Sequence, residues 1–500
     1  MVGAGPAGLA VASKLATAGW KIGLLESGGD GIDRRARSLA DGEVTGLPYY
    51  PLRKVRARAL GGSSRLWLSR RAAGSPADRM RARPLDEIDF ETRPHVPGSG
   101  WPFGAGELRQ WYDQASAFCG LPANFPDAEP APGLPGIEQT RAYFADPRQF
   151  RRLARAIAGE ANVSLFEGAT VVGWEHADGA IEAARVAGEH GRWFEVSARA
   201  FVLAGGGIEN ARVLLLSEFG APGGRANPHG QIGRYFMEHL HIDSGFVQQT
   251  TASEEYRLLS EGRAEDGSKI AALWRLPDTA QREHGLVNSV IEFRKLSGNE
   301  ATVGGRALAD MRWGLENGVS PARMAPQIKA FLRRPGSIAR TVAEKFGREV
   351  APAVGLVVTS EQSPLERSSV TLGTRTDAFG QRVARLEWHV ANSDLESLSR
   401  TQDLLDAALR RAELGSIRDK WGEAEPNPRI DGCFHAIGTT RMGATTKEGV
   451  VDSDCRVHGM ENLWIAGSSV MPTGGAATVT FTLLALALRL SNHLDAELRR

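Results

Sequence analysis

The stretch Gly3-Ala4-Gly5-Pro6-Ala7-Gly8 stands at the start of the 500-residue chain and has the spacing G-x-G-x-x-G. Apolar residues follow it at helical intervals until Gly19. Residues 21–26 (KIGLLE) then have the composition of a buried strand that ends in an acid. This order of glycine turn, helix, strand and acidic residue is typical of a unit that binds a dinucleotide at the edge of a parallel sheet.

Each position of the motif has a predicted task. The first glycine makes the turn, the second lets the backbone approach a pyrophosphate, and the third lets helix and strand pack closely. The pyrophosphate lies at the positive end of the helix dipole. The acid follows at the distance at which a ribose hydroxyl is normally bound. The predicted contacts are Gly3, Gly5, Pro6, Ala7, Gly8 and Glu26.

The strand that should precede the motif is short. Only Met1 and Val2 stand before Gly3, whereas such a strand usually has ~5 residues. Either the start codon was assigned too late or the chain has lost a central strand. We expect the former, because a parallel sheet without that strand would expose apolar neighbours.

Composition excludes several classes of protein. The 60 Lys and Arg against 59 Asp and Glu leave a formal charge of +1, so nothing indicates a nucleic-acid partner. No apolar run approaches the ~20 residues of a membrane span. Cys119, Cys433 and Cys455 form no C-x-x-C pair, which argues against disulfides and thiolate metal sites. We therefore expect a cytoplasmic protein.

Two local patterns have ordinary explanations. His239 and His241 form H-x-H without a nearby third ligand, so we expect no metal. Residues 328–350 carry six Lys or Arg against two Glu. This segment could dock on a membrane or a partner subunit, but a solvated roof helix is favoured.

Three further segments contain Gly-rich turns beside apolar runs. Taken singly, each is an ordinary turn between two elements. No second G-x-G-x-x-G accompanies them, although a flavin reductase that also uses NAD(P)H would usually carry one. The segments are residues 58–67 (RALGGSSRLW), 201–212 (FVLAGGGIENAR) and 462–473 (NLWIAGSSVMPT).

Together these segments resemble the glucose-methanol-choline (GMC) oxidoreductases, FAD enzymes that oxidise alcohols, and in particular the bacterial branch that oxidises pyranoses, glycosides and fructose. The resemblance covers almost the whole chain. Its most specific parts are residues 435–443 (HAIGTTRMG) and 466–490. Other matching parts are residues 3–8, 61–64, 84–90, 99–102, 204–212, 232–239, 361–364 and 451–457.

The resemblance implies an α/β fold in which a Rossmann-like FAD-binding domain is interleaved with a substrate domain built on a β-sheet roofed by helices. The FAD-binding domain is expected at residues 1–90, 150–240 and 431–500, and the substrate domain at 241–430. Residues 91–149 form a lid or loop region. Within the substrate domain, strand-like runs occur at 269–276, 287–293, 353–359 and 382–389, and a helical run at 394–411.

The implied cofactor is FAD, bound non-covalently because no histidine occurs in or near residues 61–67. Besides the N-terminal motif, the family pattern assigns ten residues to the cofactor. They are Gly61, Gly62, Ser63, Ser64, Val171, Ala204, Gly205, Gly467, Ser468 and Thr480.

The family's active-site histidine opens the H-x-x-G-T signature, which makes His435 the implied base. Histidine suits this task because its ordinary pKa of ~6.5 leaves it largely neutral at pH 7. The family pairs it with a His or Asn at the start of the final helix, but here Thr478 stands at that position. A threonine hydroxyl can form a hydrogen bond but cannot take the proton. His435 then acts alone, or the site is altered.

We therefore expect an FAD-dependent oxidoreductase that oxidises a primary or secondary hydroxyl of a sugar or glycoside by hydride transfer to flavin N5. Oxygen or another carrier would reoxidise the flavin. Two alternatives remain: a non-redox lyase of the same family, and a degenerate protein that binds FAD without turnover.

Overall fold

The computed structural model describes residues 1–68, 80–122, 125–146, 148–188, 191–248, 261–264, 267–296, 303–333, 353–423, 427 and 429–500. The N-terminal motif lies where the sequence predicts it. Helix α1 (Pro6–Thr17) begins directly after Gly5 and is followed by strand β1 (Ile22–Leu25). Both are largely buried because their residues are small or apolar.

Two parallel strand pairs form the nucleotide-binding sheet. β1 pairs with β6 (Val163–Phe166), and β10 (Phe201–Leu203) pairs with β20 (Leu463–Ile465). Val2 forms parallel bridges to Leu25 and to Leu203, and so joins the two pairs. The terminal amino group donates to the Gly23 carbonyl at 2.8 Å, and burial lowers its pKa to about 6. Val2 is thus the residue that links the two pairs.

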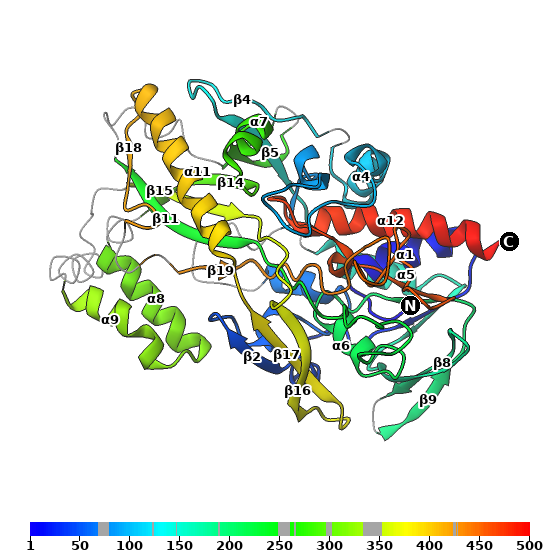
Figure 1. Cartoon of the computed structure of the whole chain (residues 1–500). Coiled ribbons are helices and arrows are strands. Elements are labelled where there is room, and N and C mark those ends of the chain that lie inside the picture. Colours follow the sequence, from blue (N-terminus) through cyan, green and yellow to red (C-terminus); the bar gives the residue numbers. More distant parts are fainter. Residues whose placement is uncertain are drawn as a thin grey trace.

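Helices cover this sheet. The last helix, α12 (Val479–Leu498), packs against α1 and against α4 (Ala105–Cys119), as Figure 1 shows. Residues 466–490, which resemble the family, end inside this helix, and the helix continues to Leu498. Twelve of its twenty residues are buried, which makes α12 part of the central core.

A ten-stranded sheet forms the other main layer, with a principal strand order of β18-β11-β15-β14-β13-β5-β3. Every pairing in it is antiparallel. Helix α11 (Asn392–Arg411) runs over it near β18 and β11 (Figure 1). The strands are β3 (Arg81–Ala82), β4 (Glu129–Pro130), β5 (Glu138–Phe144), β11 (Leu240–Gln248), β12 (Glu261–Arg263), β13 (Lys269–Arg275), β14 (Ser289–Leu296), β15 (Ala353–Ser360), β18 (Ser416–Arg418) and β19 (Asp431–Gly432).

The runs predicted at 269–276, 287–293 and 353–359 are β13, β14 and β15 of this sheet, and the helical run is α11. The run at 382–389 is a strand, β17 (Arg382–Trp388), but it lies elsewhere. It pairs with β16 (Ser369–Thr376) and, in parallel, with β2 (Gly42–Gly46) in a separate three-stranded sheet.

The large sheet crosses the domain boundaries that we drew from the sequence. β3 comes from the segment assigned to FAD, β4 and β5 from the lid or loop region, and β19 from the last segment. Residues 121–137 belong to the expected lid or loop region, and they contain β4. Residues 123 and 124 lie outside the described part of the chain. The division into domains stays a proposal.

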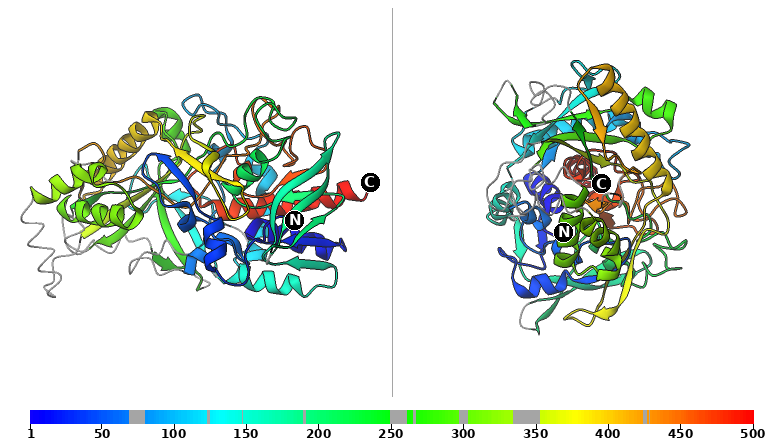
Figure 2. Two further views of the ribbon diagram at one scale, coloured as in Figure 1. Left: turned by 90° about the horizontal axis from the view of Figure 1, so that it is seen from below. Right: turned by 90° about the vertical axis from the view of Figure 1, so that its left-hand side faces the viewer.

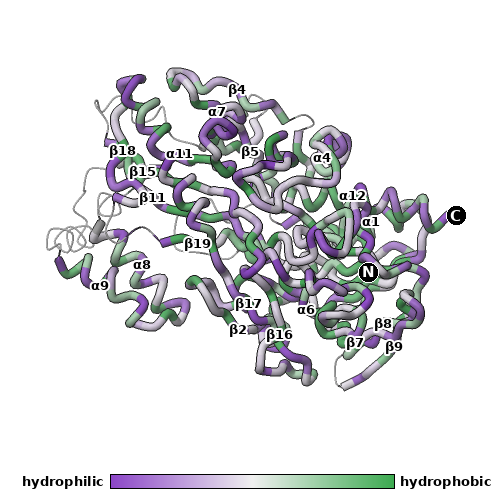
Figure 3. The backbone as a smooth tube through the Cα atoms, in the orientation of Figure 1, coloured by the Kyte–Doolittle hydropathy of each residue, from purple (hydrophilic) through white to green (hydrophobic). Residues whose placement is uncertain are grey.

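The remaining elements lie outside the sheets described above. Helix α7 (Asp278–His284) is hydrophilic and is coloured purple in Figure 3. Helices α8 (Val303–Asn317) and α9 (Ala325–Leu332) lie at the end of the molecule opposite to both termini (Figures 1 and 2). α9 covers the start of the basic segment 328–350, and residues 334–350 lie outside the described part. The other elements are α2 (Arg34–Leu39), α3 (Leu52–Val55), α5 (Gln149–Ala158), β7 (Thr170–Ala177), β8 (Ala180–Ala187), β9 (Trp193–Val196) and α6 (Glu209–Leu215).

Candidate functional site

The glycines of the N-terminal motif have two different structural roles. Gly3 has a φ of +107°, and a Cβ at Gly8 would lie 2.0 Å from the Gly3 oxygen, so the fold itself requires both glycines. Gly5 has an ordinary φ of −79°. A Cβ there would contact only the Gly62 Cα, at 3.8 Å. The fold therefore does not explain the glycine at position 5, whereas a pyrophosphate against the backbone would.

The loop 61–64 lies directly beside this turn. The Gly61 amide donates to the Ala4 carbonyl at 2.9 Å. A Cβ at Gly62 would lie 2.7 Å from the Gly5 Cα. The Ser64 hydroxyl donates to the Gly61 carbonyl, and the Ser63 hydroxyl accepts from the Ala57 amide. Both hydroxyls thus brace their own loop, which faces the predicted pyrophosphate site.

Glu26 lies at the other end of the motif, with 4% of its surface exposed. Its two carboxyl oxygens accept from the Ala4 and Gly28 amides, each at 2.9 Å. Burial raises the pKa of the carboxyl group, while these amides and the Arg58 guanidinium oppose the rise. Each oxygen keeps a further lone pair that a ribose hydroxyl could use. Val171 is buried in β7, two residues after Ala169, whose amide donates to the Glu26 carbonyl.

The strand ends at 204–205 and 466–468 lie next to the motif and to each other. The Ala204 amide donates to Val2 O at 2.7 Å, and the Ala466 amide donates to Leu203 O at 2.9 Å. Gly467 has a φ of +135°, and the next residue, Ser468, donates its hydroxyl to Ala436 O at 2.7 Å. This last bond links the predicted cofactor segment to the predicted catalytic one.

Asn210 forms two hydrogen bonds beside these strand ends that the sequence did not reveal. Its side-chain oxygen accepts from the Gly205 amide at 2.7 Å, and its amide group donates to the Ser469 hydroxyl at 3.0 Å. Asn210 is completely buried. It therefore fixes the two Gly-containing strand ends relative to each other. The signal available in the sequence was an asparagine five residues after the glycine turn.

His435 is partly exposed and contacts a second histidine. Its Nδ1 lies 2.8 Å from Nδ1 of His239, and Nε2 of His239 lies 3.2 Å from the Gly474 carbonyl oxygen. Burial lowers the pKa of both rings, and for His435 the neighbouring His239 and His241 lower it further. Both rings are therefore neutral near pH 7.

A glutamate holds the backbone at His435. Oε2 of Glu238 accepts from the amides of Cys433 at 3.1 Å and His435 at 2.9 Å, and Oε1 accepts from the Tyr49 hydroxyl. Burial raises the pKa of Glu238 to about 7. Phe434, between the two amides, has a φ of +63°. Such a conformation costs about 1–3 kcal/mol in a residue other than glycine. The glutamate thus stabilises a strained turn beside the predicted base.

Sequence reasoning missed Glu238 and Tyr49, and it considered His239 only as a metal ligand. His239 and His241 do not share a partner: the Nδ1 of His241 lies 3.4 Å from the Thr359 hydroxyl. Within the described residues, no group of three or more His, Cys, Asp or Glu side chains could hold a metal.

Thr478 is the residue before α12, and its hydroxyl donates to the backbone carbonyl of Arg81. In the part of the chain that the structure describes, no hydrogen bond joins Thr478 to His435. The structure therefore does not bring these two residues together as a catalytic pair. Thr480 lies in the first turn of α12, where helix amides are available to a ligand.

Thr478 lines a cavity of about 40 Å³ between the start of α12 and the large sheet. Half of the lining is small and apolar. The polar part comes from the hydroxyls of Thr359 and Thr478 and from Arg81, Arg83 and Glu292. Arg81 and Glu292 form a two-bond ion pair at 2.6 and 3.3 Å.

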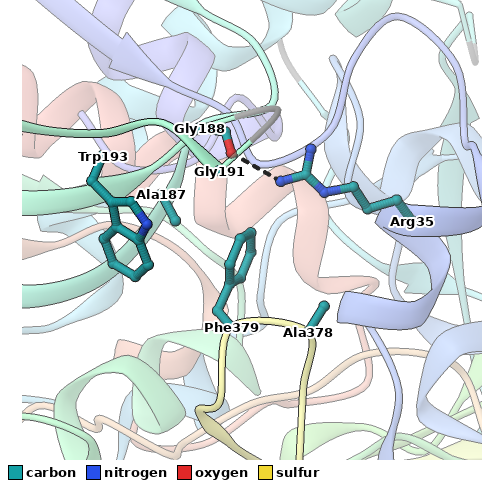
Figure 4. Close-up of a pocket in the computed structure, with 7 residues that line it drawn as sticks. All are labelled: Arg35, Ala187, Gly188, Gly191, Trp193, Ala378 and Phe379. Atoms are coloured by element: carbon teal, nitrogen blue, oxygen red, sulfur yellow. Dashed lines mark hydrogen bonds between the residues drawn. The ribbon is translucent and has the colours of Figure 1, made fainter.

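A larger cavity of about 660 Å³ lies at the surface, between β8, β9, α2 and the turn at 378–379 (Figure 4). Trp193, Phe379 and Arg35 line it, and Arg35 donates to the Gly188 carbonyl at 3.1 Å. None of the predicted site residues lines this cavity. Among the described helices, none is long and apolar enough to cross a membrane.

Two family models match the chain. Residues 1–228 match one described as "FAD dependent oxidoreductase", and residues 364–487 match one described as "GMC oxidoreductase". These matches include the N-terminal motif, His435 and Thr478.

Individual proteins are also similar to this chain. A 2-methyl-1,2-propanediol dehydrogenase of Mycolicibacterium austroafricanum is 24% identical over 99% of this chain and 94% of its own length. The fructose dehydrogenase large subunit of Gluconobacter japonicus is 24% identical over 61% of this chain and 48% of its own length. A crystal structure of pyridoxine 4-oxidase from Mesorbium loti superposes with a TM-score of 0.54 and 17% identity, over 99% of this chain and 98% of that one. This last likeness concerns the fold alone.

The residues present fit FAD. The open side of Gly5, the buried carboxyl group of Glu26 and the first turn of α12 suit a pyrophosphate, a ribose and a polar ring edge, respectively. The chain belongs to the GMC oxidoreductases, FAD-dependent enzymes that act on CH–OH donors.

Proposed function

We propose that this enzyme oxidises a hydroxyl group of a sugar or glycoside, with His435 as the base that takes the hydroxyl proton. The observation that carries the proposal is the state of His435: the residue is partly exposed, and its pKa is lowered by burial and then by His239 and His241, which keeps the ring neutral. A neutral imidazole can accept a proton, whereas an imidazolium cannot.

The chemistry requires such a base. The bound FAD supplies a hydride acceptor for the carbinol carbon. The hydroxyl proton must leave in the same reaction, because an alcohol does not ionise at neutral pH. His435 would take this proton and carry it as an imidazolium, so that the carbinol becomes a carbonyl.

We assign the cofactor to the residues that meet at the nucleotide-binding sheet. Gly5 and the loop at 61–62 would lie against the pyrophosphate, and Glu26 would accept from the ribose. We assign the remaining predicted contacts to the same cofactor: Gly3, Pro6, Ala7, Gly8, Ser63, Ser64, Val171, Ala204, Gly205, Gly467, Ser468 and Thr480.

We favour a polyhydroxylated substrate because the cavity beside Thr478 has a partly polar lining, which includes the hydroxyls of Thr359 and Thr478 and the Arg81–Glu292 pair. At about 40 Å³ this cavity would hold only part of such a substrate. The name of the fructose-oxidising relative supports this choice. We assign Thr478 a supporting role, since its hydroxyl is bonded to the Arg81 carbonyl.

A short aliphatic diol is the second candidate. The relative that matches 99% of this chain is named for a branched propanediol, and the cavity of about 40 Å³ is small.

The test is anaerobic mixing of the holoenzyme with matched panels of monosaccharides, glycosides and short diols, while the flavin absorbance is followed. Bleaching by the sugars or glycosides at low concentration supports the proposal. Bleaching by the diols alone favours the second candidate. Consumption of a substrate without bleaching would mean a lyase, and no reaction with any panel would exclude both candidates.

A further inference from the structure

Glu238 and His239 are consecutive residues at the point where the chain enters β11, and neither has any exposed surface. They contact the segment around His435 in different ways. Glu238 bonds to its backbone, and His239 bonds to the imidazole ring. Together they determine where the His435 ring lies and which of its nitrogens carries the hydrogen.

The backbone contact has the geometry of an anion-binding nest. The amides of Cys433 and His435 converge on one carboxyl oxygen of Glu238, at 3.1 and 2.9 Å. Phe434, which separates them, is in the left-handed region. Amides on either side of such a residue point to the same side of the chain, where they bind an acceptor. Oε2 can accept from both amides whether or not Oε1 carries a proton, because Oε1 faces the Tyr49 hydroxyl.

The ring contact determines where the hydrogens lie. The Gly474 carbonyl can only accept, so His239 must carry a hydrogen on Nε2. A neutral imidazole has one such hydrogen, so Nδ1 of His239 keeps its lone pair and accepts from Nδ1–H of His435. His435 is therefore left with a lone pair on Nε2.

We propose that Glu238 and His239 are positioning residues, which present His435 to the substrate hydroxyl with its lone pair on Nε2. The inference rests on the proposed function, since it gives these residues a purpose only if His435 is the base. It also defines the proton's destination: the substrate O–H bond breaks, the proton joins Nε2, and Nδ1–H stays bonded to His239.

The tautomer is directly measurable. In holoenzyme labelled with nitrogen-15 histidine, the chemical shifts of a neutral ring distinguish a hydrogen on Nδ1 from one on Nε2. The resonances of His435 are assigned from their loss in His435→Asn. We expect the Nδ1–H form in the unmodified holoenzyme. An Nε2–H form for His435 would overturn the inference.

Two substitutions of His239 separate positioning from a general structural effect. His239→Asn keeps a side-chain oxygen near the position of Nδ1, which can accept from His435, whereas His239→Leu removes the acceptor. We expect His239→Leu to lose the single Nδ1–H form and to slow anaerobic flavin reduction by about 10–100-fold, with FAD still bound. His239→Asn should keep the tautomer and recover most of the rate.

Glu238 is tested in the same way. Glu238→Gln keeps an oxygen for the two amides and should retain most of the rate of flavin reduction. Glu238→Leu removes that oxygen and should slow flavin reduction even at saturating substrate, where a change in KM has no effect. His458→Asn is the matched control, because Nε2 of His458 also bonds to a backbone carbonyl, that of Gly443 at 3.0 Å. His458→Asn should change neither the tautomer of His435 nor the rate of flavin reduction.

The outcomes distinguish this inference from the proposed function. If His435→Ala stops flavin reduction while His239→Leu leaves rate and tautomer unchanged, the inference is wrong and the function stands. If His239→Asn is as slow as His239→Leu although its tautomer is retained, the effect is structural and the inference fails. If His435→Ala itself leaves flavin reduction intact, the proposed function fails first.

Discussion

Replacing Gly5 by alanine should separate cofactor binding from folding. The φ of −79° at Gly5 is one that alanine adopts freely, and the added Cβ would contact only the Gly62 Cα, at 3.8 Å. We therefore expect the stability of the apoprotein to change by less than about 1 kcal/mol. The same Cβ occupies the side from which a pyrophosphate would approach the backbone, so FAD affinity should fall at least about tenfold, or about 1.4 kcal/mol.

Gly8→Ala is the matched control, because it adds the same methyl group three residues further along the same motif. There the Cβ would lie 2.0 Å from the Gly3 backbone oxygen and 3.2 Å from the Ala204 Cβ. Such an overlap cannot be relieved by a side-chain rotation. It should destabilise the protein by roughly 3 kcal/mol or more, with or without FAD.

The assay is titration of each apoprotein with FAD, followed by flavin fluorescence, together with thermal unfolding of the apoprotein. For Gly5→Ala we expect an unchanged unfolding midpoint and weakened binding, and for Gly8→Ala a lowered midpoint. Gly5→Ala apoprotein that binds FAD as tightly as the unmodified chain would refute the placement of the pyrophosphate.

Two further predictions concern single side chains. Thr478→Val should slow flavin reduction by no more than about tenfold, since it removes one neutral hydrogen bond of ~1 kcal/mol to the Arg81 carbonyl. Thr478→Ser, which keeps the hydroxyl, should reduce the flavin at nearly the rate of the unmodified enzyme. If Thr478→Val lost as much rate as His435→Ala, Thr478 would take part in the proton transfer. Glu238 has its pKa raised to about 7 by burial, so the folded state binds a proton that the unfolded state releases above its ordinary pKa of 4.5. The stability of the unmodified protein relative to Glu238→Gln should therefore be largest below pH 4.5 and fall as the pH rises through 7. Thermal unfolding of both holoproteins at several pH values measures this difference in stability. A stability difference that grows with pH would contradict the raised pKa.

The sequence predicted the parts of the molecule that depend on local patterns. The glycine motif, helix α1, strands β13 to β15 and helix α11 follow from turn residues and from hydrophobic spacing within a few residues. Pairing between distant segments has no such local signal. The sequence therefore did not reveal that β17 pairs with β2 across more than 300 residues, or that β3 and β5 extend the large sheet.

The same limit applies to the site. His435 was found through its motif, but its partner His239 is 196 residues away. The H-x-H pattern drew attention to His239 only as a metal ligand, because the spacing of two histidines along the chain says nothing about a third ring from another segment. Thr478 was placed correctly at the start of α12, yet only the structure shows that its hydroxyl is bonded to Arg81.

The most direct test of whether His435 takes the substrate proton is single-turnover reduction of the flavin in the absence of oxygen, with the best sugar or glycoside from the panel. The unmodified holoenzyme and His435→Ala are compared at equal FAD content and saturating substrate. We expect the unmodified enzyme to bleach in one fast phase, and His435→Ala to bleach about 10²–10⁴-fold more slowly with its FAD retained. Equal rates in the two proteins would contradict the assignment of His435 as the base.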